Sequence, residues 1–141
     1  GEPRSVEERA ADPKPSALRG SETVLVVEDE DDVRELVVQI LRRFGYDVLS
    51  AGSSDEAVRA FRRAPGRVHL LLTDVVMPGA SGKQLAKQLR ISNPETRVLF
   101  MSGYTDNVIV QHGILERGTS LIEKPFTAAE LARRVRQVLD A

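Results

Sequence analysis

Apolar runs of four or five residues alternate with longer amphipathic stretches over most of the chain. The run Val24-Leu25-Val26-Val27 is continuous and rich in β-branched residues, which is typical of a strand buried on both faces of a sheet. Further short runs predict strands at 47–50, 69–73, 97–101 and 120–123. The sequence therefore predicts five short strands, with room for a helix after each.

The amphipathic stretches predict the helices. Apolar side chains recur at helical spacing over residues 31–44, and Gly45 follows where a helix C-cap would fall. Another helix is expected from Ser81 through Arg90. Capping-box patterns mark the starts of two more, at Ser53–Glu56 and Thr127–Glu130.

Strands that alternate with helices predict an α/β fold with a parallel sheet covered on both faces. We expect a doubly wound (βα)5 domain with a five-stranded parallel sheet. Between Tyr104 and Gly118, β-branched residues and glycines leave space only for a short fourth helix, which we expect to be the most mobile part. Residues 1–20 carry prolines among charged side chains and predict a linker or disordered tail. The domain then occupies residues 21–141.

The composition narrows the classes of function. Hydrophobic residues make up 41% of the 141 residues, and the 20 basic side chains nearly balance the 21 acidic ones, which gives no case for nucleic-acid or membrane binding. The chain has no cysteine, so disulfides and thiolate metal sites are excluded. With no signal-peptide-like or membrane-spanning apolar stretch, a cytoplasmic location is expected.

Polar residues follow four of the predicted strands, and ligands of open parallel sheets bind at that edge. The first strand ends in Glu28 and Asp29, the third in Asp74, the fourth in Ser102 and the fifth in Lys124. Clustered carboxylates repel one another unless a cation neutralises them, and hard oxygen ligands suit Mg²⁺. We expect Asp29 and Asp74 to ligate Mg²⁺ directly and Glu28 to act through a water.

The backbone carbonyl of Val76 is expected to complete the protein's share of the metal ligands. Lys124 supplies a positive charge that pairs with Asp74 before reaction and with phosphoryl oxygens afterwards. Ser102 offers a hydroxyl to the phosphoryl group. Phosphoryl transfer needs positioning and charge neutralisation above all, and this set provides both.

At these residues the chain resembles the receiver domain of two-component response regulators, and the resemblance implies a flavodoxin-like fold with the strand order 2-1-3-4-5. The matching stretches are Val-Val-Glu28-Asp29-Glu, Leu-Leu-Leu-Thr-Asp74-Val-Val-Met-Pro-Gly, Met-Ser102-Gly and Glu-Lys124-Pro-Phe. The resemblance implies that Asp74 accepts a phosphoryl group from phosphohistidine, beside Mg²⁺ at Glu28 and Asp29. It also implies that Ser102 is the switch hydroxyl and that Lys124 contacts the phosphoryl group. Such a domain catalyses its own phosphorylation and dephosphorylation, and the Lys124–Pro125 bond is cis in many relatives.

Two positions depart from the family's pattern. Leu121 stands where many receivers carry an aromatic switch residue, so an aromatic ring cannot swing inward there. Val76 is apolar where some fast-hydrolysing relatives place a polar side chain that helps to orient water. We therefore expect slow dephosphorylation of Asp74.

The stretches before and after the domain predict its context. A charged, proline-containing tether at the start, and no output domain after the last helix, resemble the C-terminal receiver of a hybrid sensor histidine kinase. Its partners would be its own or a cognate kinase core, and a histidine phosphotransfer protein downstream. A free-standing single-domain regulator and a receiver-like interaction module without phosphorylation stay open. A flavin-binding protein is disfavoured, because a run of acids replaces the phosphate loop.

Other polar residues have simpler interpretations. Asp31 and Asp32 are expected to be solvated residues of a first helical turn. Gly79 and Gly82 are expected to serve turn geometry. The arginines of the last helix, Arg133, Arg134 and Arg136, are expected to form a solvated face.

Overall fold

The computed structural model describes residues 15–103 and 119–141. Five parallel strands form one sheet in the order β2-β1-β3-β6-β7, which in chain order is the predicted 2-1-3-4-5. The strands are β1 (Thr23–Val27), β2 (Asp47–Ala51), β3 (Leu70–Asp74), β6 (Arg97–Ser102) and β7 (Leu121–Glu123). The helices are η1 (Pro15–Leu18, a 3-10 helix), α2 (Asp31–Arg43), α3 (Ser54–Arg63), α4 (Gly82–Ser92) and α6 (Ala128–Asp140).

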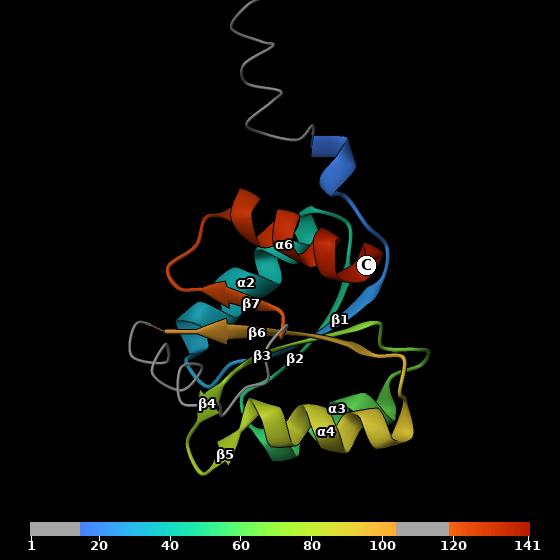
Figure 1. Ribbon diagram of the computed structural model, residues 1–141, viewed down its shortest axis with the longest axis vertical. Helices are drawn as coiled ribbons and strands as arrows, with labels where there is room; N and C mark the ends of the chain where they lie inside the picture. The colour runs from blue at the N-terminus through green and yellow to red at the C-terminus, as the bar shows by residue number, and fades with distance from the viewer. Residues whose placement is uncertain (1–14, 104–118) are drawn as a thin grey trace, which may run out of the picture.

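The sheet lies between two helical layers, with α2 and α6 on one face and α3 and α4 on the other (Figure 1). Successive residues of a strand point to opposite faces. Val24 and Val26 accordingly pack with α2 and α6 in one apolar core, whereas Leu25 and Val27 pack with α3 and α4 in the second. Because both faces are buried, the strands need continuous apolar runs, and the sequence has them.

Polar caps fix where the helices begin. The Thr127 and Glu130 side chains form the predicted capping box at the start of α6. Ser81 accepts a hydrogen bond from the amide of Gln84 and caps α4. At α3 the prediction is only half right. Ser53 accepts from the amide of Glu56, but the Glu56 carboxylate accepts from Gly52, one residue before the cap.

A small antiparallel hairpin, β4 (Val76–Met77) paired with β5 (Ala80–Ser81), follows β3 and was not predicted. Gly79 has a φ of 71° in its turn, a backbone conformation that favours glycine, as expected for turn geometry. Gly82 has a different role. A Cβ atom on Gly82 would overlap the backbone carbonyl of Asp74, so this glycine allows α4 to start directly against the end of β3.

Arg136 joins α6 to the segment that enters the domain, and the prediction of a solvated arginine face is wrong for it. Its side chain is 18% exposed and pairs with Glu22 at 2.6 Å and with Asp140 at 2.8 Å. It also donates to the Tyr46 hydroxyl and to the carbonyl of Arg19. The Arg136 guanidinium lowers the pKa of Glu22 to about 2.

We call Arg19, Glu22, Tyr46, Arg136 and Asp140 the amino-terminal clamp. It lies at the amino edge of the sheet, where β1 begins. Leu18, just before it, is buried, and the amide of Gly20 donates to the carbonyl of Phe44. Residues 18–20, which were predicted to belong to a linker, therefore pack against the domain. Leu18 adds an apolar side chain to this contact.

The predicted short helix between Tyr104 and Gly118 lies outside the described residues. In the part of the chain that the structure describes, no helix is long and apolar enough to cross a membrane.

Candidate functional site

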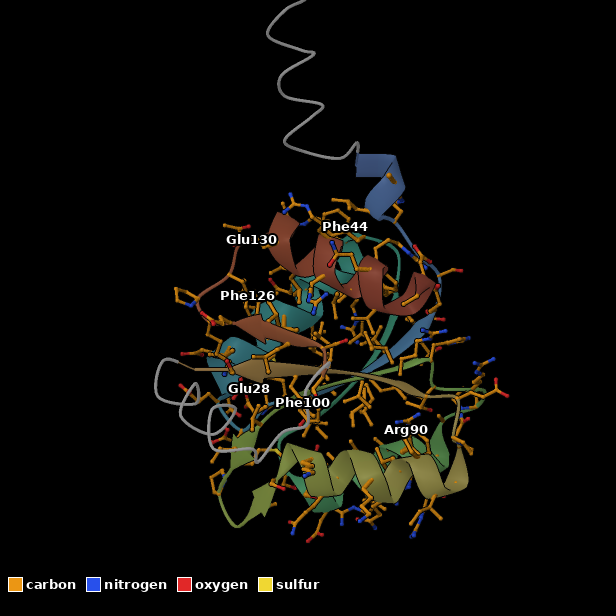
Figure 2. The ribbon with its side chains drawn as sticks, viewed as in Figure 1. Glu28, Phe44, Arg90, Phe100, Phe126 and Glu130 are labelled. Atoms are coloured by element: carbon orange, nitrogen blue, oxygen red, sulfur yellow. The ribbon has the colours of Figure 1, made fainter. Side chains whose placement is uncertain are left out.

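The predicted site residues meet at the carboxyl edge of the sheet, beyond the ends of the central strands. Asp74 is the last residue of β3 and Ser102 the last of β6, while Glu28 follows β1 and Lys124 follows β7. Glu28 lies at this edge in Figure 2. The register of the strands brings the four together, because β3 is hydrogen-bonded to both β1 and β6, and β6 to β7.

Lys124 bridges two buried carboxylates. Its Nζ atom lies 2.8 Å from Oδ1 of Asp74 and 2.6 Å from Oε1 of Glu28. The side chains of Glu28 and Asp74 are 1% and 7% exposed, and that of Lys124 is 24% exposed. Burying charged groups costs desolvation free energy. Such a buried ion pair is stable only when opposite charges and hydrogen bonds compensate for that cost. The backbone amide of Lys124 donates to the carbonyl of Ser102, which holds the lysine at this edge.

The two carboxylates are inequivalent. Burial and the nearby Glu28 carboxylate raise the pKa of Asp74, Lys124 lowers it, and together they leave that pKa at about 8. Burial also acts on Glu28, but hydrogen bonds with Asp74, Lys124 and the amide of Glu30 outweigh it and lower the pKa of Glu28. The pKa of Lys124 is raised despite burial, because both acids favour its charged form.

Glu28, Asp29 and Asp74 form a cluster that suits a divalent cation. Each offers a carboxylate oxygen, and the three oxygens lie within 4.8 Å of one another. Asp29 is exposed, so the cluster opens to solvent on its side. Three acids facing one lysine leave an excess of negative charge, and hard oxygen donors favour Mg²⁺ over softer metals. The donor set therefore fits the predicted ion.

Ser102 is buried, and among the described residues its Oγ atom has no hydrogen-bond partner. A buried hydroxyl without a partner costs free energy, and such groups are often found where a ligand completes the site. The sequence predicted the hydroxyl and its place at the end of a strand, but not its burial.

Val76 and Leu121, the two departures from the family's pattern, lie on different strands. Val76 is in β4, two residues beyond Asp74, and is 50% exposed. Leu121 pairs with Phe100 across β6 and β7 and packs against the core that α3 and α4 cover. The Lys124–Pro125 peptide bond is cis.

Two neighbours of the site were not predicted from the sequence. Gly82 lies against the carbonyl of Asp74, and Arg34 donates to the carbonyl of Glu28 at 2.7 Å. Asp31 is an exposed first-turn residue, as expected, but it also pairs with Arg34 at 2.6 Å. The spacing of Asp31 and Arg34, three residues apart on one helix, is the signal that could have indicated this pair.

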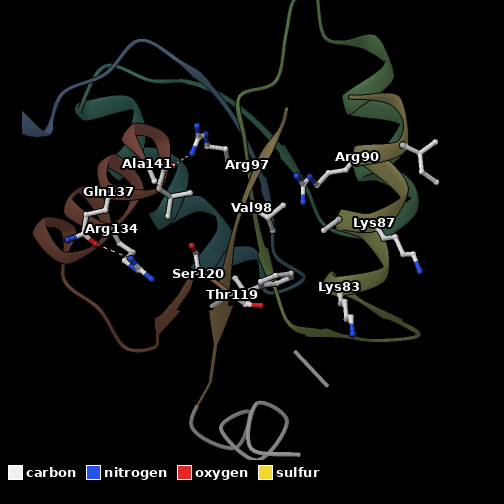
Figure 3. A pocket seen from close by; sticks show the side chains of 14 residues that line it. Lys83, Lys87, Arg90, Arg97, Val98, Thr119, Ser120, Arg134, Gln137 and Ala141 are labelled. Carbon is white, nitrogen blue, oxygen red and sulfur yellow. Dashed lines mark hydrogen bonds between the residues drawn. The ribbon is translucent and has the colours of Figure 1, made fainter. Parts of the chain in front are cut away.

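A separate pocket lies between α4 and α6 on the flank of β6, and none of the predicted site residues lines it (Figure 3). The residues that line it include the basic residues Lys87 and Arg90 from α4 together with Arg97 and Arg134, and the side chain of Arg90 points from α4 toward the sheet. Arg97 donates to the carbonyl of Val138 and Arg134 to that of Leu121. These two arginines therefore hold α6 against the sheet.

The fold and the acidic edge define a receiver-type domain, and comparison with known proteins agrees. Residues 24–136 match the response regulator receiver domain family, so the chain belongs to the receiver domains of two-component signalling. It is 36% identical to the sensor kinase CckA of Brucella abortus, over 98% of this chain and 16% of that protein. It is 28% identical to the response regulator receiver protein CpdR of the same species, over 84% of this chain and 97% of that one.

Among solved structures, the receiver domain of the hybrid histidine kinase CckA superposes with a TM-score of 0.69 at 35% identity, covering 83% of this chain and 98% of that one. The chain spans about half the length of three transcriptional regulatory proteins that it also matches. Receiver domains as a family bind Mg²⁺ at an acidic site and interact with histidine kinases and phosphotransfer proteins.

Proposed function

We propose that this domain accepts a phosphoryl group on Asp74. The observation that carries the proposal is the bridge from Lys124 to Asp74 and Glu28 at the carboxyl edge. It places a fixed positive charge 2.8 Å from the carboxylate that would become an acyl phosphate. A carboxylate that only stabilised the fold would not need to be buried beside a second acid.

Four groups would hold Mg²⁺: the carboxylates of Glu28, Asp29 and Asp74 and the backbone carbonyl of Val76. The ion supplies positive charge that offsets the acids and the incoming phosphoryl oxygens. Lys124 then moves from the Asp74 carboxylate to a phosphoryl oxygen. The Ser102 hydroxyl donates to another phosphoryl oxygen, which gives its buried Oγ atom a partner.

The transfer is a displacement at phosphorus. A carboxylate oxygen of Asp74 forms a bond to phosphorus while the P–N bond of a phosphohistidine breaks, and the imidazole nitrogen keeps the bonding electron pair. Asp74 must be ionised to attack. Cations beside it favour that form and oppose the effect of burial on its pKa. Hydrolysis later transfers the phosphoryl group to water.

We place this domain in a hybrid sensor histidine kinase. The similarity to the sensor kinase CckA extends over 98% of the chain and so includes residues before the family match, whereas matches to seven other curated relatives cover 79–84% of it. A domain over residues 21–141 would then receive its phosphoryl group from the kinase core in the cytoplasm and pass it to a histidine phosphotransfer protein. CpdR, which the chain matches over 97% of its length, makes a free-standing regulator the second candidate.

The phosphoacceptor is tested by incubating the domain with Mg²⁺ and a small acyl phosphate, and comparing wild type with Asp74→Ala. Wild type should gain the mass of one phosphoryl group, and hydroxylamine should remove it. The variant should gain none. Equal labelling of both proteins would place the acceptor elsewhere. No labelling of wild type, and no response to beryllofluoride, would favour an interaction module without phosphorylation.

The context is tested on the gene. A kinase core encoded in frame before Gly1 supports the hybrid kinase, and a start codon close to Gly1 supports the free-standing regulator.

A further inference from the structure

Arg34, in the first turn of α2, contacts the acidic loop after β1 in two places. Its Nη1 atom donates to the backbone carbonyl of Glu28 at 2.7 Å, and its Nη2 atom pairs with Asp31 at 2.6 Å. The side chain is 23% exposed. One planar guanidinium therefore holds both the peptide group that joins Glu28 to Asp29 and the start of the helix.

The same guanidinium packs over the turn after β2. A Cβ atom on Gly52 would lie 3.0 Å from Nη1 of Arg34, and the amide of Gly52 is bound by Glu56. Each polar group of Glu28 is held by at least one hydrogen bond. Its amide donates to Ala51, its carbonyl accepts from Arg34, and its carboxylate accepts from the amide of Glu30 and from Lys124.

We propose that Arg34 is a positioning residue for the metal site, and that it acts through the Glu28 carbonyl to hold Asp29 in the orientation that binds Mg²⁺. This inference rests on the proposed function. A guanidinium can make both bonds at once because its donors form a rigid fork, whereas a lysine ammonium offers a single point charge. Residues that orient metal ligands in this way commonly change metal affinity about 10-fold to 100-fold when they are replaced.

The direction in which Mg²⁺ affinity changes on replacing Arg34 distinguishes positioning from simple electrostatics. Arg34 is a cation next to a cation site, so its charge alone opposes Mg²⁺ binding. If charge were its only effect, Arg34→Met would bind Mg²⁺ more tightly than wild type, and Arg34→Lys would bind it equally. Positioning predicts weaker binding in both variants.

The experiment is a Mg²⁺ titration of the complete chain, followed by the amide NMR shifts of the residues around Asp29, for wild type, Arg34→Met and Arg34→Lys. Arg42→Met is the matched control. Arg42 lies on the same helix and also donates to a backbone carbonyl, that of Val48, away from the acidic loop. Thermal unfolding in a chelator shows whether each variant is folded at the temperature of the titration.

We expect the dissociation constant for Mg²⁺ to rise about 10-fold in both Arg34 variants, and to stay unchanged or fall slightly in Arg42→Met. Unchanged or tighter binding in Arg34→Met would overturn the inference about Arg34 and leave the proposed function intact. Equal weakening in Arg42→Met would also overturn it, because loss of any arginine on α2 would then suffice. If wild type does not bind Mg²⁺, the proposed function fails and the inference fails with it.

Discussion

Replacing Asp74 with asparagine should stabilise the metal-free domain at neutral pH. The Asp74 side chain is 7% exposed and shares Lys124 with Glu28, so one lysine faces two buried acids. The pKa of Asp74 is raised from 3.8 to about 8, mainly by burial. The folded state therefore holds a proton that the unfolded state has lost at pH 7, and holding it costs stability. The neutral amide of asparagine removes this cost.

The magnitude follows from the pKa. Well below pH 3.8, Asp74 is protonated in both the folded and the unfolded state, and its protonation costs no stability. As the pH rises from 3.8 towards about 8, the unfolded state loses this proton first, and the stability of the fold falls. One pKa unit corresponds to about 1.4 kcal/mol, which gives an upper limit of about 4 kcal/mol at pH 7. Asparagine also removes the fraction of folded molecules in which an ionised Asp74 pairs with Lys124, which offsets part of the gain. We expect a net gain of about 1–2 kcal/mol, or roughly 5 °C in Tm.

The assay is denaturant unfolding in a chelator at several pH values between 4 and 8. The free energy of unfolding of Asp74→Asn should exceed that of wild type at pH 7, and the difference between the two should vanish towards pH 4. Asp47→Asn, at an exposed aspartate that begins β2, should follow wild type throughout. Saturating Mg²⁺ should reduce the difference, because the ion stabilises only the ionised wild-type site. A variant less stable than wild type at pH 7, or a gain that grows towards pH 4, would refute the reasoning.

Three further predictions concern other parts of the domain. Gly82→Ala should push the carbonyl of Asp74 aside and reduce the rate of labelling by an acyl phosphate at least about 10-fold; an unchanged rate would contradict this. Glu22→Gln should lose about 1 kcal/mol of stability at pH 7. Because the pKa of Glu22 is about 2 in the fold, this contribution disappears as the pH falls from 4.5 towards 2, and unfolding curves should converge there. Phosphorylated wild type should keep its label for minutes or longer, because Val76 offers no polar group to orient water; a half-life of seconds would disprove it.

The sequence predicted the sheet because its strands are buried on both faces, so that each needs a continuous apolar run such as Val24–Val27. The site could be predicted for a related reason. Parallel strands end at one edge, so Asp74, Ser102 and Lys124 had to meet there once the strands were assigned. Both inferences use local patterns and one rule of topology.

The contacts that escaped prediction join residues far apart in the chain. Arg136 meets Glu22 across 114 positions, and no local pattern marks either as a partner. The hairpin of β4 and β5 has two residues in each strand, which is too short for a period to be recognised. Gly82 is required because the start of α4 lies directly against the backbone of Asp74. That contact depends on where α4 packs, and not on the residues next to Gly82 in the sequence.

The amino-terminal clamp has a consequence for how a covalently attached donor would reach Asp74. The clamp fixes the chain at the amino edge of the sheet, and the site lies at the opposite edge, about 16 Å away along a five-residue strand. A tether gains at most about 3.5 Å per residue, so at least about five residues must run back along the domain before a phosphohistidine can meet Asp74. The length beyond that minimum sets the effective concentration of the donor, and with it the choice between transfer within one protein and transfer between two.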